Sequence, residues 1–147
     1  MTPLRPMGVT PHLFVRDTDA AVAFYHTAFG AAELLRNSLP DGRVLFVELA
    51  VGPARLLLSE ETPSLNALAP PTIGGSPVLL HVEVEDPDAV ARRAVDAGAV
   101  VEMPAQEMFW GERYGVLRDP SGHRWAVSTA REQLTPDDIA HRTPPDV

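Results

Sequence analysis

Cysteine is absent from the 147-residue sequence. This absence excludes disulfide bonds, catalysis by a thiolate, and zinc or iron–sulfur sites built on cysteine. No apolar run approaches the roughly 20 residues that a helix needs to cross a bilayer. Residues 1–7 also lack the apolar segment of a signal peptide. From these absences we expect a cytoplasmic protein with no membrane partner.

Basic residues are few, and they are scattered along the chain rather than grouped. The 12 Lys and Arg residues stand against 20 Asp and Glu residues, which makes the formal net charge −8. Nucleic-acid-binding proteins normally present a basic stripe, so we expect no nucleic-acid partner. The sequence also lacks a nucleophile elbow, a P-loop and the glycine fingerprint of dinucleotide-binding folds. Its length indicates a single domain with enough core to fold unaided.

The sequence does contain an internal repeat at an offset of about 69 residues, which is the separation of His12 and His81. The same offset aligns further residues of matching type: Asp17 with Asp86, Arg55 with Arg124, and Ser59 with Ser128. A repeated supersecondary unit cannot bury its apolar face alone, so copies pair with each other. We therefore expect two copies to enclose a pseudo-symmetric cleft that holds the functional residues.

Each copy begins with a pattern typical of a strand followed by a helix. Apolar residues alternate at about 9–15 and again at 78–84, as they do in a strand with one buried face. Asp17 or Thr18 can cap the first helix and Asp86 the second, and a glycine ends each helix. Three further strands are expected in each copy, at about 31–36, 43–50 and 54–59, and at 99–103, 114–119 and 123–129.

The predicted fold is α+β, with two β-α-β-β-β modules whose eight strands form a curved sheet around a cleft. The chain divides into module one at about 8–62, a proline- and glycine-rich linker at 63–76, module two at 77–130, and a tail at 131–147 with a short helix near its start. The apolar face of each first strand must lie under its helix, because burial occurs there. His12, Phe14 and His81 are therefore expected to face the cleft.

Several motifs resemble the vicinal oxygen chelate superfamily, which includes glyoxalase I, extradiol dioxygenases and bleomycin-binding proteins. The motifs are Val15-Arg-Asp, Ala23-Phe-Tyr and Phe29-Gly in module one, and Asp119-Pro-Ser-Gly-His in the last hairpin. The segment Met108-Phe-Trp-Gly-Glu-Arg-Tyr-Gly resembles the PhnB-like branch. The resemblance covers roughly residues 8–129 and implies a glyoxalase-like fold and a homodimer. It leaves open whether the cleft forms within one chain or across two.

The resemblance also implies four metal positions, where metal-dependent members carry histidine or glutamate on the cleft faces of four strands. In this sequence those positions hold Thr10, Leu57, Leu79 and Ala126. None of the four offers the imidazole nitrogen or carboxylate oxygen that such ions require. We therefore expect no metal at these positions and no other cofactor.

A second set of residues lies two positions further along the same strands and on the same face: His12, Ser59, His81 and Ser128. Three interpretations of the histidines stay open. They can be cleft-wall residues hydrogen-bonded to neighbours, or they can contact a ligand, as donors or as an acid and a base near neutral pH. They can also form an atypical metal site, although two imidazoles and two hydroxyls make a poor one.

An aromatic loop precedes the seventh strand, where Phe109, Trp110 and Tyr114 flank a glycine. Such a loop can cover an apolar or planar ligand, with Arg113 as a partner for an anion. The same residues can instead cap a sheet end or form a dimer contact. Both interpretations stay open.

Two arginines, Arg55 and Arg124, share the cleft-facing parity of the serines. They can clamp a carboxylate or phosphate, or they can pair with an acid such as Glu48 or Glu83. His123, beside the final turn, is expected to be exposed to solvent.

These observations favour a metal-free protein that binds a small apolar or aromatic metabolite or antibiotic in the cleft between the modules. The alternative is a glyoxalase-like lyase or isomerase that uses His12 and His81 for proton transfer or for atypical metal binding. No catalytic residue is assigned. The expected ligand-binding residues are His12, Phe14, Ser59, His81, Phe109, Trp110, Arg113, Tyr114, Arg124 and Ser128.

Overall fold

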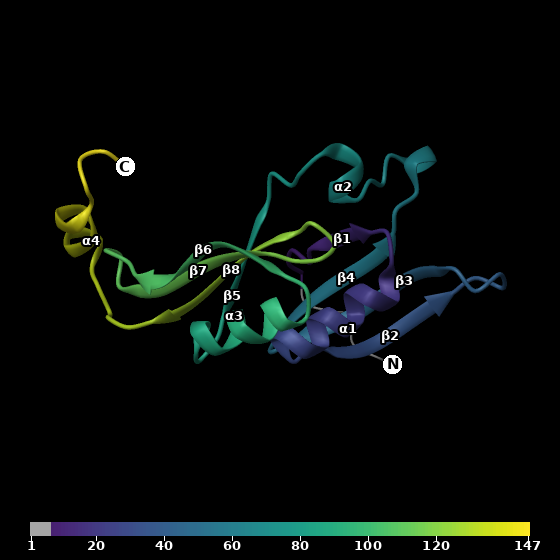
Figure 1. Ribbon diagram of the computed structural model, residues 1–147, viewed down its shortest axis with the longest axis horizontal. Coiled ribbons are helices and arrows are strands. Elements are labelled where there is room, and N and C mark those ends of the chain that lie inside the picture. The colour runs from purple at the N-terminus through teal and green to yellow at the C-terminus, as the bar shows by residue number, and fades with distance from the viewer. Residues whose placement is uncertain (1–6) are drawn as a thin grey trace.

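The computed structural model describes residues 7–147, and it contains two modules with the same order of elements (Figure 1). Module one comprises β1 (His12–Val15), α1 (Thr18–Phe29), β2 (Ala32–Ser38), β3 (Val44–Val51) and β4 (Ala54–Glu60). Module two comprises β5 (Leu79–Glu83), α3 (Pro87–Asp96), β6 (Val100–Glu107), β7 (Glu112–Arg118) and β8 (Arg124–Ala130). The predicted α+β fold of two β-α-β-β-β modules is therefore confirmed.

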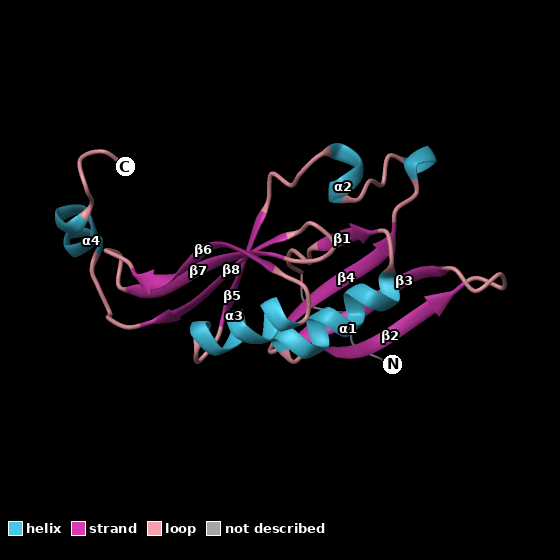
Figure 2. Cartoon of the chain, in the orientation of Figure 1, coloured by secondary structure: helices cyan, strands magenta, loops and turns pink. Residues whose placement is uncertain are grey.

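The eight strands form two sheets of four, with the strand orders β1-β4-β3-β2 and β5-β8-β7-β6 (Figure 2). In both sheets the first strand pairs in parallel with the last strand of its own module, and the other neighbours are antiparallel. The register repeats as well, since His12 lies opposite Leu57 and His81 lies opposite Ala126. The 69-residue offset of the sequence is thus an offset between structurally equivalent positions.

Aspartate caps both of the long helices in the same way. The side chain of Asp17 accepts a hydrogen bond from the backbone N–H of Ala20 at 3.0 Å, and Asp86 accepts one from Ala89 at 3.1 Å. Of the two candidates for the first cap, Asp17 is the one used, and Thr18 is the first helical residue. Gly30 ends α1 in the left-handed conformation, with φ of 68°, which costs little because glycine has no Cβ.

The helices α1 and α3 pack against each other and join the two modules into one hydrophobic core (Figure 1). Tyr25 and Phe29 of α1 meet the indole ring of Trp125 from β8, at centroid distances of 5.4 and 4.7 Å. Leu13 and Val15 of β1 are buried in this core, 7% and 0% exposed. Each sheet therefore has a face under a helix and an opposite face, which we call the helix-free face.

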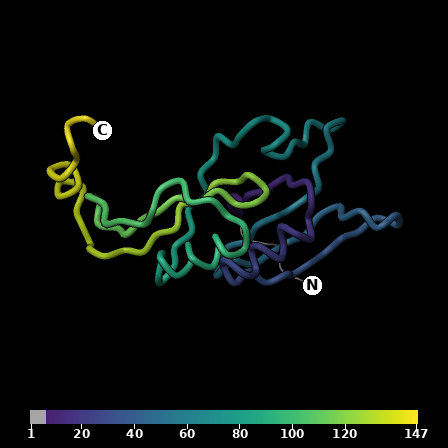
Figure 3. Tube along the Cα trace, viewed as in Figure 1, coloured from purple at the N-terminus to yellow at the C-terminus, as the bar shows by residue number. Residues whose placement is uncertain are grey.

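The β7–β8 turn makes the polar part of the joint between the modules. Its Asp119 is 4% exposed and accepts hydrogen bonds from the hydroxyl of Tyr25 and from Nε1 of Trp125, the latter at 2.9 Å. The backbone N–H groups of Ser121 and His123 donate to the same carboxylate. Figure 3 shows this turn, in light green, beside the purple strand β1.

His123 contradicts the expectation of exposure, because it is buried at 9% exposure. Its Nε2 donates a hydrogen bond to the backbone carbonyl of Phe14 at 2.8 Å. The two residues are 109 positions apart in the sequence. The error arises because a turn residue is exposed only when nothing docks on the turn, and here module one does.

The parent protein is expected to lose stability at alkaline pH, and replacement of Tyr25 by phenylalanine should abolish this pH dependence. Burial raises the pKa of Tyr25 well above its ordinary value of 10.0, and the Asp119 carboxylate raises it further. The native state therefore keeps this proton after the unfolded chain has released it. The contribution of Tyr25 to the free energy of unfolding is therefore complete below about pH 10. Above that pH it decreases by about 1.4 kcal/mol per pH unit.

The measurement is urea denaturation of both proteins between pH 8 and 11. The Tyr25→Phe variant should be less stable at pH 8, because it lacks the hydroxyl that donates to Asp119, but its curve should be flatter above pH 10. An equally steep decline in both proteins would show that another group causes it.

The predicted linker contains two short helical segments, η1 (Pro63–Leu65) and α2 (Pro70–Ile73). Proline at the first helical positions favours them, because its fixed φ suits a helix start. The predicted helix of the tail is α4 (Pro136–Arg142), which begins at a capping box made by Thr135 and Asp138. None of the helices among the described residues is long and apolar enough to cross a membrane. The signal-peptide expectation concerns residues 1–7, of which 1–6 lie outside the described residues.

Candidate functional site

The structure brings each cleft-facing histidine together with the serine predicted to share its face. Nε2 of His12 lies 2.7 Å from Oγ of Ser59, and Nε2 of His81 lies 2.5 Å from Oγ of Ser128. Both pairs are hydrogen-bonded, and both lie on the helix-free faces. We call them the His–Ser sites. The serine stands two residues beyond the strand position opposite its histidine, so the two side chains meet diagonally across neighbouring strands.

Burial differs between the two members of each pair. Ser59 is 8% exposed and Ser128 is fully buried, whereas both histidines are exposed residues. The buried serine thus holds each imidazole through Nε2, and the rest of the ring lies at the surface. Nδ1 of both rings makes no hydrogen bond to any residue between 7 and 147. Each site therefore holds, in a fixed orientation, one ring nitrogen that has no partner in the described part of the chain.

The module-two site is bordered by a carboxylate and by three aromatic rings. Oε2 of Glu112 lies 3.5 Å from Nε2 of His81. The Tyr114 ring meets the imidazole edge-on at a centroid distance of 5.8 Å. Trp110 contacts Tyr114 at 5.3 Å, and Phe109 contacts Trp110 at 5.0 Å. The aromatic loop that stands out in the sequence therefore lies next to His81.

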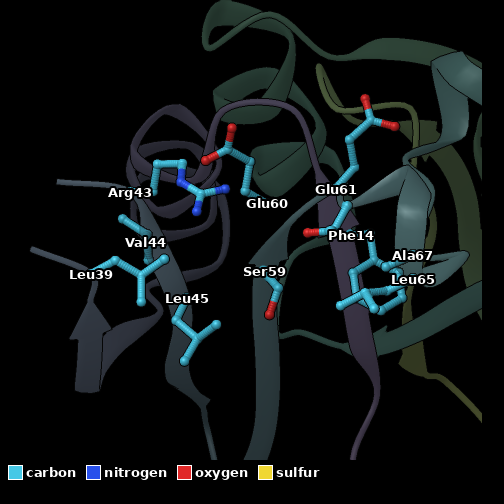
Figure 4. A pocket seen from close by; sticks show the side chains of 11 residues that line it. Phe14, Leu39, Arg43, Val44, Leu45, Ser59, Glu60, Glu61, Leu65 and Ala67 are labelled. Carbon is cyan, nitrogen blue, oxygen red and sulfur yellow. The ribbon is translucent and has the colours of Figure 1, made fainter. Parts of the chain in front are cut away.

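The module-one site adjoins a cavity of about 160 Å³ (Figure 4). Ser59 and Phe14 line it together with the β2–β3 hairpin and the segment after β4. In Figure 4, Phe14 lies beside Leu65 and Ala67 on one side of Ser59, and Leu45 lies on the other. The Phe14 ring also contacts the imidazole of His12 at a centroid distance of 4.9 Å. An aromatic ring and an apolar hollow thus accompany the polar pair.

Arg113 does not join the residues that the sequence analysis grouped with it. Tyr114 and Glu112 face His81, so alternation turns Arg113 to the opposite face of β7. There its guanidinium binds Asp88 at 2.6 and 3.0 Å and the carbonyl of Ala105 at 3.1 Å. These contacts raise the pKa of Arg113, chiefly through the hydrogen bonds to Asp88. Its cation is already paired within module two, away from the His–Ser site.

Arg55 and Arg124 both pair with carboxylates. Arg55 lies 2.6 Å from Glu48, as one of the open interpretations has it. Arg124 lies 2.8 Å from Glu102 of β6, and not beside Glu48 or Glu83. Glu48 is only 2% exposed, and it stands in the same row across the sheet as Leu57 and His12. Its position in an alternating strand is the signal that could have marked it as a residue of the helix-free face.

The four implied metal positions hold side chains that do not fit a metal. Leu57, Leu79 and Ala126 carry no donor atom, and Thr10 has only a hydroxyl. Within residues 7–147, no group of three or more histidine, aspartate or glutamate side chains is gathered so that it could hold an ion. Hard and borderline cations need several imidazole or carboxylate ligands, so this donor set is unsuited to them.

Comparison with known proteins supports the resemblance drawn from the motifs. An uncharacterized protein of Mycobacterium bovis is 37% identical over 135 residues, which cover 90% of this chain and 89% of that protein. The X-ray structure of an Arabidopsis thaliana gene product is 30% identical, with a TM-score of 0.68, and the match covers 84% of this chain and 99% of that one. TioX from Micromonospora sp. ML1 is 26% identical, with a TM-score of 0.65, over 88% and 100% of the two chains.

A family model matches residues 8–127, which include both modules and both His–Ser sites. The chain belongs to the Glyoxalase/Bleomycin resistance protein/Dioxygenase superfamily.

Proposed function

We propose that the protein binds a small apolar or aromatic compound, such as a metabolite or an antibiotic, at its His–Ser sites without a metal. One observation carries the proposal. Each imidazole is held through Nε2 by a buried serine, aromatic rings stand beside it, and its Nδ1 makes no hydrogen bond within residues 7–147. Binding sites for small molecules combine such an apolar lining with a few fixed polar groups.

The aromatic rings supply most of the expected affinity. Trp110 and Tyr114 present large apolar surfaces with little conformational freedom, and a planar ligand can stack on either ring. The imidazoles then orient the ligand by a hydrogen bond to Nδ1. Three of the four implied metal positions, which hold Leu57, Leu79 and Ala126, add apolar contact rather than charge. The same loop sequence supports placement in the PhnB-like branch of the superfamily.

We infer that the binding unit is a cytoplasmic homodimer. The histidines lie on separate sheets, and the helix-free faces carry apolar side chains that a second copy can cover. Leu35 of β2 is 48% exposed and Leu79 of β5 is 38% exposed. Large exposed apolar side chains grouped on a sheet are typical of interfaces. A dimer would let a ligand touch His12 of one copy and His81 of another.

Titration with planar aromatic probes, beginning with bleomycin and acridine orange, tests the binding function. Binding should quench the fluorescence of Trp110 in a saturable way, and Trp110→Phe should remove most of this change, because Trp125 is buried in the core. His81→Ala should raise the Kd about tenfold, the loss of roughly one good hydrogen bond.

His141→Ala is the matched control, because His141 lies on α4 and its Nδ1 donates to the carbonyl of Asp137. Its Kd should equal that of the parent protein. Failure of every probe to quench Trp110, or equal binding by the His81→Ala variant, would refute the proposed site.

A proton-transfer reaction at the same site is the second candidate function, and the state of His12 favours it. Burial lowers the pKa of His12, so its ring is neutral at pH 7 and can accept a proton. Turnover of a hemithioacetal with a bell-shaped pH–rate profile would support this reaction. Metal analysis of the purified protein, with and without His81→Ala, separates the acid–base version from a metal-dependent one.

A further inference from the structure

A second cavity lies on the helix side of module two, away from the His–Ser sites. It occupies about 400 Å³ between α3 and the strands β6, β7 and β8. Its walls are mainly apolar and include Ala91, Val101, Met103, Leu117 and Val127. This volume falls within the roughly 300–1,000 Å³ of small-molecule pockets. The cavity is therefore large enough to take a ligand of its own.

The duplicated module explains why the space is open. By the 69-residue offset, Val22 of α1 is the equivalent of Ala91 of α3. By the strand register, Val47 of β3 is the equivalent of Gly115 of β7. Gly115 cannot carry a side chain without displacement, because its Cβ would lie 3.0 Å from the backbone nitrogen of Ala105. At Gly115 the backbone of β6 takes the place of a side chain, whereas Ala91, where the other copy has Val22, leaves space under α3.

The more exposed end of the cavity lining, which includes Asp88 and Arg92 and which we call its mouth, carries a cation that no carboxylate among residues 7–147 contacts directly. Asp88 lies at this mouth, but both of its oxygens are bound by Arg113, which also contacts Glu107 at 3.3 Å. Arg92 lines the same mouth and is exposed. It makes no hydrogen bond or ion pair with any residue of the described chain and has only a longer-range attraction to Asp88. A positive charge is thus available in a protein whose net charge is −8.

We propose that this cavity binds a medium-chain carboxylate, with its alkyl chain between α3 and β6 and its carboxylate on Arg92. Apolar walls gain free energy by removing the chain from water. A guanidinium at the mouth matches a carboxylate through two parallel hydrogen bonds. The site lies on the opposite face of β7 from His81, so this binding is independent of the proposed function of the His–Ser sites.

The protein offers a selective reporter, because Met103 is the one methionine among residues 7–147 that lines the cavity. Protein labelled with ¹³C in the methionine methyl groups is titrated with sodium octanoate. The Met103 resonance should shift saturably, while that of Met108, in the aromatic loop, should stay in place. Octanol at the same concentrations should bind more weakly, because it lacks the charge that Arg92 recognises.

Two variants distinguish the contribution of the apolar walls to octanoate binding from that of the arginine at the mouth. Ala91→Leu fills the cavity and should reduce octanoate affinity at least tenfold, with an unchanged melting temperature as evidence of a retained fold. Arg92→Gln should weaken octanoate about fivefold and leave octanol unaffected. Arg118→Gln, an exposed arginine at the end of β7, is the matched control and should bind like the parent protein.

An unshifted Met103 resonance at saturating octanoate would overturn the proposal. So would a shift of Met108 in place of Met103, because the octanoate would then occupy the His–Ser site. Equal affinities of the parent protein and the Ala91→Leu variant would exclude this cavity as well. Failure of the aromatic probes at Trp110 would have no bearing on these outcomes.

Discussion

Replacement of Asp119 by alanine is expected to lower the free energy of unfolding by about 4 kcal/mol. The carboxylate is 4% exposed and accepts from Tyr25, Trp125 and two backbone N–H groups. Alanine would leave these donors buried without partners, and each unsatisfied donor costs about 1–3 kcal/mol. The loss is measured by urea denaturation at pH 7, followed by Trp fluorescence and by circular dichroism.

Asp41→Ala is the matched control for this prediction. Asp41 also lies in a hairpin turn and accepts from a backbone N–H, that of Arg43 at 3.0 Å, but it is exposed. Water can replace its contacts, so the variant should lose far less stability than Asp119→Ala. Equal losses in the two variants would mean that Asp119 acts only within its own turn and does not join the modules.

Replacement of Gly122 by alanine is expected to cost about 2–4 kcal/mol of unfolding free energy. Gly122 has a φ of 93°, which disfavours a residue with a Cβ by about 1–2 kcal/mol. An added Cβ would also lie 2.8 Å from Cβ of Pro70, at the start of α2. Forcing atoms into a packed site costs about 1–3 kcal/mol more. The turn would have to move away from α2, and denaturation midpoints would report the loss.

Gly42→Ala isolates the steric part of this effect. Gly42 has nearly the same φ, 90°, in the turn between β2 and β3, and it donates to the carbonyl three residues earlier as Gly122 does. No atom lies within 4 Å of the added Cβ. Only the conformational cost of about 1–2 kcal/mol is expected there. Equal losses of stability in both variants would show that the contact with Pro70 adds nothing to the destabilisation.

The two predictions concern one structural feature, the docking of the β7–β8 turn on module one and on α2 of the linker. Through His123 the turn holds the carbonyl of Phe14, the aromatic neighbour of His12. Loosening the turn should therefore disturb the module-one His–Ser site, although the turn itself touches no ligand. This links the stability of the joint to the binding proposed for the molecule.

Local patterns were sufficient for much of the candidate site. The pairing of His12 with Ser59 and of His81 with Ser128 follows from alternation along strands and from the 69-residue offset. Both are properties of short segments, because successive side chains of a strand point to opposite faces. The same rule, applied to β7, separates Arg113 from its neighbour Tyr114. The prediction grouped Arg113 with Tyr114 by proximity in sequence, whereas the structure places the two side chains on opposite faces of β7.

Contacts between distant segments explain what could not be read from local patterns. His123 is buried, and Asp119 accepts a hydrogen bond from Tyr25, because a turn of module two meets α1 and β1 of module one. The partner of Arg124 is on β6, and the cavity under α3 depends on a strand that bends toward Gly115. These features require the register and packing of whole modules, which no single stretch of sequence encodes.

The order of the elements, the helix caps and the faces of the first strands are therefore determined by the amino-acid sequence, through residue periodicity and side-chain chemistry that act over a few residues. The division of the strands into two sheets, the joint at Asp119 and the second cavity depend on tertiary structure. Each depends on packing between segments that are far apart in the sequence. At the joint, for example, Tyr25 of α1 meets Asp119 of the β7–β8 turn, 94 residues away, and this packing decides which polar groups lose contact with water.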